Sequence, residues 1–209
     1  MSQNTSHAVM SQRREPHDSL DFFPTPAWGT RALCNQLEAH VCDLHNMTAW
    51  DPACGEGHMV APLREYFAQV LGSDVHEYFP GKTLLCDFLM FGEPCVDPVD
   101  WIITNPPFRL AEQFALKAIS RAKVGTALLV RTAFLEAIGR YNNLFSRFPP
   151  AYIFQFTERL PMVKGRVDEE AASATAYCWI VWLAQSDGAT LFKWIAPCRD
   201  IFERDGDYA

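Results

Sequence analysis

Residues 99–108 read Val99-Asp100-Trp101-Ile102-Ile103-Thr104-Asn105-Pro106-Pro107-Phe108. The first six have the length and apolar character of a buried strand. The two prolines fix φ and remove backbone donors, so the following turn is stiff and its carbonyls are free to accept hydrogen bonds. Asn105 adds an amide oxygen and Phe108 adds a flat apolar face. This combination suits a planar ring with an exocyclic amine, such as a nucleobase.

The segments around this stretch alternate between strand-like and helical patterns, which is typical of an α/β fold with a mostly parallel sheet. Three other predicted strands end in acids, at Asp51, Asp74 and Asp87. Ligands of such sheets bind at the carboxyl ends of the strands, so we expect these acids near Asn105. Helical spacing predicts helices over residues 27–41, 58–68, 110–122 and 134–148.

The first of these acids opens a glycine-containing turn, Asp51-Pro52-Ala53-Cys54-Gly55-Glu56-Gly57. Glycines at a strand-to-helix turn let the backbone approach a ligand closely. The turn lacks the spacing of dinucleotide and P-loop motifs, and its leading acid favours a cationic or hydroxyl-bearing ligand over a phosphate. An ordinary tight turn fits the same residues. Asp74 and Asp87, taken singly, also fit ordinary caps.

Length and composition predict one globular domain in 209 residues. Residues 1–20 are polar and unpatterned, so we expect a flexible N-terminal arm followed by a single domain at 21–209. No apolar run is long enough for a membrane helix and no signal-peptide core is visible, which makes a cytoplasmic protein without a membrane partner the default. The net charge of −7 disfavours a non-specific nucleic-acid binder but permits a local basic strip.

The cysteine pattern predicts neither a disulfide framework nor a metal site. There are seven cysteines, an odd number, and none shows the Cys-x-x-Cys spacing. We expect most of them to be small buried apolar residues in a reducing compartment.

The motifs, taken in chain order, resemble the S-adenosylmethionine-dependent DNA N6-adenine methyltransferases with the gamma motif order, of the phage or orphan type. Phe23-Pro24-Thr25-Pro26 is similar to the aromatic-x-Thr-Pro motif of that family, and it precedes the glycine turn and Asn105–Phe108. The resemblance extends from about Asp21 to Leu183. It implies a Rossmann-like class I methyltransferase fold, with a mostly parallel seven-stranded sheet and helices on both faces.

The resemblance also implies S-adenosyl-L-methionine as cofactor and a role for each motif. Asp74 would bind the ribose, and Asp87 and Phe88 the adenine of the cofactor. The implied catalytic residues are Asn105, Pro106, Pro107 and Phe108, with Asn105 and the Pro106 carbonyl accepting from the target amine and Phe108 stacking on the base. The implied cofactor-binding residues are Phe23, Thr25, Pro26, Asp51, Pro52, Ala53, Cys54, Gly55, Gly57, Asp74, Asp87, Phe88 and Asn105.

Two later segments bear on the target. Met162 stands where relatives place a second aromatic residue against the base, so the second stacking partner stays open. The polar stretch from Lys164 to Thr175 is expected to be a flexible, solvated loop.

The function that we expect is methyl transfer to adenine N6 in DNA with short or relaxed sequence specificity, since the chain has little room for a recognition domain. RNA could replace DNA as the partner, and the protein could be a monomer or a homodimer. A non-catalytic cofactor-binding or nucleic-acid-binding protein is a further alternative. Methylation of protein glutamine or of cytosine N4 fits less well, because relatives of those types more often have Tyr at the place of Phe108 or Ser at the place of Asn105.

Overall fold

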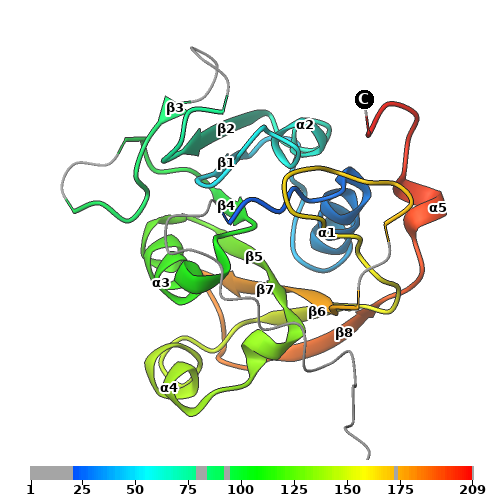
Figure 1. Cartoon of the computed structure of the whole chain (residues 1–209). Coiled ribbons are helices and arrows are strands. Elements are labelled where there is room, and N and C mark those ends of the chain that lie inside the picture. Colours follow the sequence, from blue (N-terminus) through cyan, green and yellow to red (C-terminus); the bar gives the residue numbers. More distant parts are fainter. Residues whose placement is uncertain (1–20, 79–83, 92–94, 172–173, 209) are drawn as a thin grey trace, which may run out of the picture.

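A central sheet of eight strands organises the chain in this computed structural model, which describes residues 21–78, 84–91, 95–171 and 174–208 (Figure 1). The expected N-terminal arm at 1–20 lies outside the described residues. The strand order is β3-β2-β1-β4-β5-β7-β6-β8. The strands are β1 (Thr48–Asp51), β2 (Gln69–Asp74), β3 (Leu84–Leu85), β4 (Trp101–Thr104), β5 (Gly125–Arg131), β6 (Tyr152–Phe156), β7 (Tyr177–Leu183) and β8 (Leu191–Ile195).

Neighbouring strands are parallel except at β7, which runs antiparallel to both β5 and β6. The expected mostly parallel α/β sheet is therefore confirmed. The expected number of seven strands is wrong, because β8 adds an edge strand that pairs in parallel with β6. Leu191, Phe192 and Trp194 are each at least half exposed in this strand, so it lacks the buried pattern by which a strand is predicted.

Helices cover both faces of the sheet, as expected (Figure 1). Side chains of a strand alternate between faces, and β4 separates two apolar cores in this way. Trp101 and Ile103 pack in the core that contains α1, whereas Ile102 packs in the core that contains α3. The helices are α1 (Ala27–His40), α2 (Val60–Leu63), α3 (Ala111–Arg121), α4 (Ile138–Arg140) and α5 (Arg199–Phe202).

The expected helix over 134–148 is broken. A 3₁₀ turn (Thr132–Leu135), α4 and a π-helical turn (Tyr141–Phe145) follow one another instead. Ala137, between the first two, has a φ of 133°, which no helix accommodates. The interruption lies beside β5, so the chain turns sharply where that strand reaches the carboxyl edge of the sheet.

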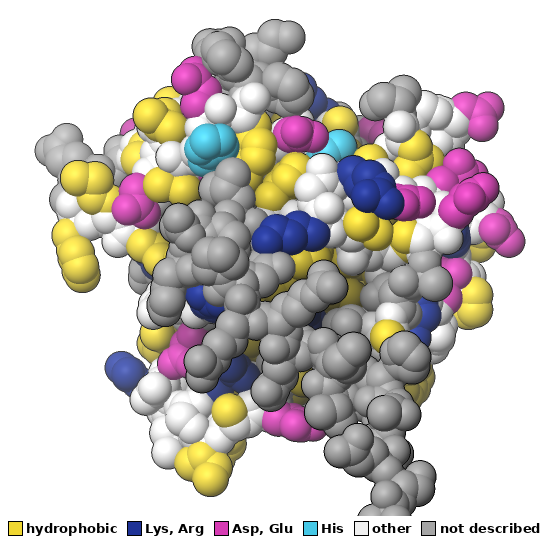
Figure 2. All heavy atoms as spheres, in the orientation of Figure 1, with side chains coloured by type: hydrophobic (Ala, Val, Ile, Leu, Met, Phe, Trp, Pro, Cys, Tyr) yellow, Lys and Arg dark blue, Asp and Glu magenta, His cyan; other side chains and the backbone are white. Residues whose placement is uncertain are grey.

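The C-terminal segment is tied to α1 through Arg31. The guanidinium group is almost completely buried and donates to Glu65, to the Phe202 carbonyl and to Asp207, at distances between 2.6 and 3.1 Å. Acidic side chains gather over α5 and the residues after it, toward the right edge of the molecule (Figure 2). In the view of Figure 1, α5 lies on the other side of α1 from α3.

One cysteine pair departs from expectation, since Cys86 and Cys95 form a disulfide bond. The segment after β3 returns on itself before β4, which brings the two Cα atoms within 6.1 Å despite a nine-residue separation. Of the remaining cysteines, Cys34, Cys178 and Cys198 are buried in apolar surroundings, as predicted. Within the described part of the chain, no helix is long and apolar enough to cross a bilayer.

Candidate active site

The side chain of Asn105 is held in a defined orientation at the carboxyl end of β4. Its amide nitrogen donates to the Phe23 carbonyl oxygen at 2.8 Å and to the Thr25 hydroxyl at 3.2 Å. Both donors of the amide group are thereby used, which identifies the other atom of the amide as the oxygen. That oxygen, Oδ1, is buried and has no hydrogen-bond partner among the described residues. A buried acceptor without a partner can accept a hydrogen bond from a bound ligand.

The glycine turn lies next to Asn105 and is folded against β2. The Gly55 N–H donates to Asp74 at 2.9 Å, and the Cys54 N–H donates to the Ser73 carbonyl oxygen at 2.9 Å. Gly55 and Gly57 have φ values of 51° and 88°, a left-handed conformation that glycine adopts without strain. The glycine turn and Asp74 are therefore adjacent, as expected for residues at the carboxyl ends of neighbouring parallel strands.

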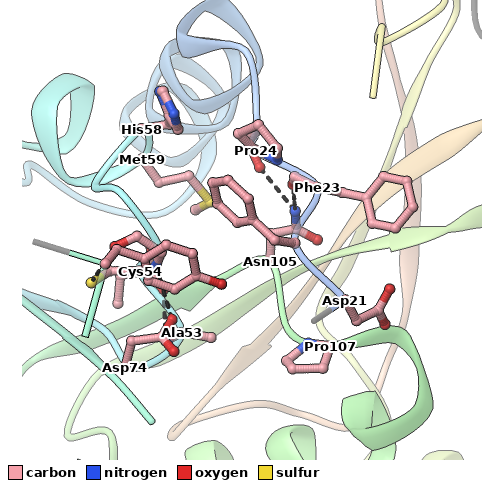
Figure 3. A pocket seen from close by; sticks show the side chains of 15 residues that line it. Asp21, Phe23, Pro24, Ala53, Cys54, His58, Met59, Asp74, Asn105 and Pro107 are labelled. Carbon is pink, nitrogen blue, oxygen red and sulfur yellow. Dashed lines mark hydrogen bonds between the residues drawn. The ribbon is translucent and has the colours of Figure 1, made fainter. Parts of the chain in front are cut away.

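These elements enclose one pocket, with Asn105 between the Asp21–Phe23 segment on one side and the glycine turn on the other (Figure 3). Asp51 and Asp74 line it, together with Thr25, Ala53, Cys54 and Gly55. No lysine or arginine is among the described residues that line it. An acidic pocket without a lysine or arginine side chain favours a cationic ligand over a phosphate.

The electrostatics of the pocket follow from its burial and from its two acids. Burial, reinforced by the negative charge of Asp74, raises the pKa of Asp51 to about 7, although the backbone N–H of Ala53 favours its charged form. Burial and the same two acids raise the pKa of the Cys54 thiol to about 12. Cys54 is therefore a neutral thiol near pH 7 and is poorly suited to act as a nucleophile.

Two aromatic rings close the pocket. The Phe22 ring lies so near the glycine turn that a Cβ atom added at Gly55 would fall 2.5 Å from it. Its centroid is 4.8 Å from that of Tyr78. The remaining volume is about 90 Å³, below the ~300 Å³ at which small-molecule pockets begin. At this volume the pocket does not admit a nucleoside-sized ligand, so binding one requires side chains that close the pocket to move.

Phe108 lies on the other side of Asn105 from the glycine turn and is half-buried. Its backbone N–H donates to the Asp21 carboxylate at 2.7 Å, and its ring is 5.2 Å from the ring of Phe23. The guanidinium carbon of Arg131 lies 4.2 Å from the centre of the Phe108 ring. Met162 is buried in the core under α1, and Phe108 packs against the same core.

Asp87 and Phe88 lie elsewhere. They line a second, larger pocket of about 660 Å³ between the segment after β3 and α3. Phe88 is buried against Trp50 and Phe114, and the exposed Asp87 carboxylate accepts from the Leu89 N–H at 2.9 Å. The structure thus brings the upstream motif, the glycine turn, Asp74 and Asn105 together, and it leaves Asp87 and Phe88 outside that pocket. Their assignment to the adenine of the cofactor stays a prediction.

The two prolines after Asn105 fix the turn as expected. Pro106 is buried, and the Pro107 carbonyl oxygen accepts from the Leu110 N–H at 2.9 Å to start the turn before α3. Pro26 precedes the first residue of α1, where its fixed φ is compatible with a helix start. Pro52 is buried at the end of β1.

Four residues around the site were not singled out as candidates from the sequence: Asp21, Phe22, Tyr78 and Arg131. Phe22 and Asp21 stand directly before the aromatic-x-Thr-Pro motif, which was the available signal for them. Tyr78 follows β2 and Arg131 is the last residue of β5, so their positions near strand ends could have indicated them.

The loop from Lys164 to Thr175, described at 164–171 and 174–175, is anchored at Gly165 and at Glu169. The Gly165 N–H donates to the Phe22 carbonyl oxygen at 2.9 Å, and Arg199 donates to the Glu169 carbonyl oxygen at 2.9 Å. Lys164 and Arg166 are exposed. The loop therefore lies against the Phe22 segment, in contact with one wall of the pocket.

No protein-family model matches the sequence, and no curated protein matches it. Solved structures do match. A Listeria monocytogenes protein assigned as a class I S-adenosylmethionine-dependent methyltransferase is 17% identical with a TM-score of 0.63, over 84% of this chain and 67% of that one. The methyltransferase subunit of a Streptococcus thermophilus type I restriction-modification system is 12% identical with a TM-score of 0.61, over 81% and 46%. A Pyrococcus horikoshii protein assigned as an RNA methyltransferase is 17% identical with a TM-score of 0.58, over 85% and 96%.

The chain has the class I methyltransferase fold. The strand order with an antiparallel β7 and the similarity to these structures agree on this point. This chain spans about half of the Streptococcus subunit and nearly all of the Pyrococcus protein. A further similar structure, a magnesium protoporphyrin IX methyltransferase from Synechocystis with bound S-adenosylmethionine, has a TM-score of 0.52 at 14% identity. The class I methyltransferase fold is therefore shared across several substrate classes.

Proposed function

We propose that this protein transfers a methyl group from S-adenosylmethionine to the N6 amine of adenine in DNA. The observation that carries the proposal is the buried Asn105 Oδ1, which lacks a partner among the described residues and is held in place by the bonds from its amide nitrogen to Phe23 and Thr25. An acceptor in this state, followed by two prolines and an aromatic ring, is suited to an aromatic amine.

The residues of the pocket fit the cofactor by chemistry. S-adenosylmethionine carries a sulfonium and an ammonium group, and Asp51, Asp74 and the glycine turn form a pocket in which no described lining residue is Lys or Arg. When bound, the cofactor supplies an electrophilic methyl group on positively charged sulfur. Rotation of the Phe22 ring makes room for it, because that ring lies against Gly55.

The chain's own residues then act mainly by positioning. Asn105 Oδ1 and the Pro106 carbonyl oxygen accept the two hydrogens of the target amine, which turns its lone pair toward the methyl donor. Phe108 supports the base on one face. Such positioning contributes about 7–11 kcal/mol to a reaction between two bound groups. No strong base is required, because the amine loses its proton after attack. An adenine in duplex DNA leaves the stack to reach this site.

RNA is the second candidate substrate, and one observation favours it. This chain covers 96% of the Pyrococcus protein assigned as an RNA methyltransferase, with no large part of that protein left over. By contrast, it covers 46% of the restriction-modification subunit. The gamma order of the motifs supports DNA as the first candidate.

One assay separates these candidates. The protein is incubated with methyl-labelled S-adenosylmethionine and, in parallel, with unmethylated DNA, RNA or bulk protein, and mass spectrometry identifies the labelled product. Label in N6-methyladenine from DNA supports the proposal. Label in RNA alone would show that RNA, and not DNA, is the substrate. Cofactor binding without label in any acceptor would favour the non-catalytic alternative.

A further inference from the structure

The second partner of the target base is open because Met162, which stands where relatives place an aromatic residue, is buried and has no ring. Only 8% of Met162 is exposed, and it packs with the core under α1. Phe23 is close to Phe108, but the two rings are tilted by 41° and Phe23 packs against that core. Tyr177 is also near, at 6.4 Å between ring centroids, and is buried. None of these three presents a free flat surface opposite Phe108.

Arg131 does present one. It is exposed, and its guanidinium carbon lies 4.2 Å from the centre of the Phe108 ring. It is the last residue of β5, at the carboxyl edge of the sheet, and its register partner on β7 is Tyr177. Burial raises the pKa of Tyr177, and the positive charge of Arg131 opposes that rise, so the two side chains interact. The base of the Arg131 side chain is thus fixed by the sheet, and its end contacts both Phe108 and Tyr177.

The guanidinium group of Arg131 lies over the Phe108 ring with no base between them. Two stacked planes in contact are about 3.5–4 Å apart, so a base between the ring and the guanidinium requires about twice that distance. Guanidinium planes stack on bases as aromatic rings do, and arginine is the preferred cation for this contact. Arg131 would lift by roughly one base thickness to admit the target.

We infer that Arg131 is the second base-stacking residue, covering the face of the target adenine opposite Phe108. This inference rests on the proposed function and names a residue that the motif resemblance does not supply. In the absence of nucleic acid, Arg131 rests on Phe108 and occupies the base position. When the flipped adenine binds, the contact between Arg131 and Phe108 is replaced by two contacts, one between the base and Phe108 and one between the base and Arg131.

The test compares three variants at Arg131 and one control variant at Arg109, using sheared unmethylated DNA as methyl acceptor. Arg131→Ala removes the plane and the charge, Arg131→Lys keeps the charge, and Arg131→Tyr keeps a plane. Arg109→Ala is the control, because Arg109 is exposed, follows Phe108 in the chain and has no ring contact within the part of the chain that the structure describes. The readouts are kcat and KM for DNA, the salt dependence of binding, and the affinity for S-adenosylmethionine.

Arg131→Ala and Arg131→Lys should each lower kcat/KM for DNA by about tenfold or more, the effect of losing one stacking partner. Arg131→Tyr should recover most of that loss, and cofactor affinity should stay close to that of the wild type in all variants. Full activity of Arg131→Lys would show a phosphate contact in place of stacking and would overturn the inference, as would wild-type kinetics of Arg131→Ala. Absence of transfer by the wild type would instead overturn the proposed function, and this inference with it.

Discussion

The amide nitrogen of Asn105 donates to the backbone carbonyl oxygen of Phe23 at 2.8 Å, across 82 residues of sequence. This bond joins the turn after β4 to the segment before α1. It also decides which atom of the amide faces away from that segment, since a flipped amide would place two oxygens together. The acceptor that the proposed reaction needs is therefore oriented by a residue outside the Asn-Pro-Pro-Phe motif.

The Thr25 hydroxyl should contribute measurably to this orientation. Thr25→Val keeps the shape of the side chain but removes the acceptor 3.2 Å from the Asn105 nitrogen. We expect the free energy of unfolding to fall by about 1 kcal/mol and kcat for methyl transfer to fall by about tenfold, with a smaller change in cofactor affinity, since Thr25 also lines the pocket. Steady-state kinetics and chemical denaturation measure these effects.

Thr30→Val is the matched control for this substitution. Thr30 is buried in α1, and its hydroxyl has no hydrogen-bond partner among the described residues. The same change there should leave transfer unchanged and should not lower stability, because no bond is lost. If the two variants had equal kinetics, Thr25 would have no orienting role.

Cofactor binding should depend on pH through Asp51. Below its pKa of about 7 the carboxyl group is neutral, so a cationic ligand binds more weakly there. The association constant for S-adenosylmethionine should rise by up to about tenfold per pH unit below 7 and level off above it, as linkage requires. Asp51→Asn should abolish this dependence, which calorimetric titration between pH 5 and 8.5 would reveal.

The same group should make the free protein less stable as pH rises. The folded state keeps a proton on Asp51 that the unfolded chain, with the ordinary pKa of 3.8, has released. Its contribution to stability is therefore fully present below about pH 4 and is lost between about pH 4 and 7. Asp51→Asn should flatten this part of the stability profile, whereas Asp187→Asn, in an exposed loop, should leave it as in the wild type. An unaltered profile in Asp51→Asn would contradict the burial argument.

The contact between Phe22 and Gly55 can be tested by adding one methyl group. Gly55→Ala places a Cβ 2.5 Å from the Phe22 ring and adopts a φ of 51°. We expect a loss of about 1–3 kcal/mol in the free energy of unfolding and weaker cofactor binding, from strain and overpacking together.

Two further variants separate these causes. Gly188→Ala has a comparable φ of 84°, but its nearest neighbouring atom lies 3.9 Å away, so it reports the strain alone. The double variant Phe22→Ala/Gly55→Ala should recover the part of the stability lost to the clash. Equal losses in Gly55→Ala and Gly188→Ala would show that the Phe22 ring does not press on the turn.

Arg31 should matter far more for stability than its exposed neighbour Arg204. Both pair with Glu65 at 2.9 Å, but the Arg31 side chain is 5% exposed and that of Arg204 is 57% exposed. Arg31→Ala leaves Asp207 and Glu65 without their buried cation and should lower the free energy of unfolding by about 3–5 kcal/mol. Arg204→Ala should lower it by less than about 1 kcal/mol. Similar losses in denaturant titrations of the two variants would contradict this difference.

The parts of the fold that depend on local pattern could be predicted from the sequence. The strand predicted over residues 69–74 is found at Gln69–Asp74, and Asn105 follows β4 as expected. Asp51, Asp74 and Asn105 converge because parallel strands place their carboxyl ends at one edge. The positions of these three residues therefore follow from the strand topology alone, without knowledge of their side-chain contacts.

Other parts depend on contacts between distant segments, and the sequence pattern does not contain them. Phe22 covers Gly55 across 33 positions, and Arg131 rests on Phe108 across 23. The Cys86–Cys95 bond depends on a return of the chain after β3 that no cysteine spacing rule describes. β8 was missed because most of its side chains are exposed, so burial left no imprint on its sequence.

The most direct test of the central claim is transfer of labelled methyl from S-adenosylmethionine to unmethylated DNA by the wild type and by Asn105→Ala. We predict label in N6-methyladenine with the wild type, and a loss of at least about 100-fold in kcat/KM with Asn105→Ala that far exceeds any change in cofactor affinity, because the variant lacks the acceptor for the amine. Transfer by Asn105→Ala at the wild-type rate would contradict the account, as would a wild type that binds the cofactor and methylates no adenine.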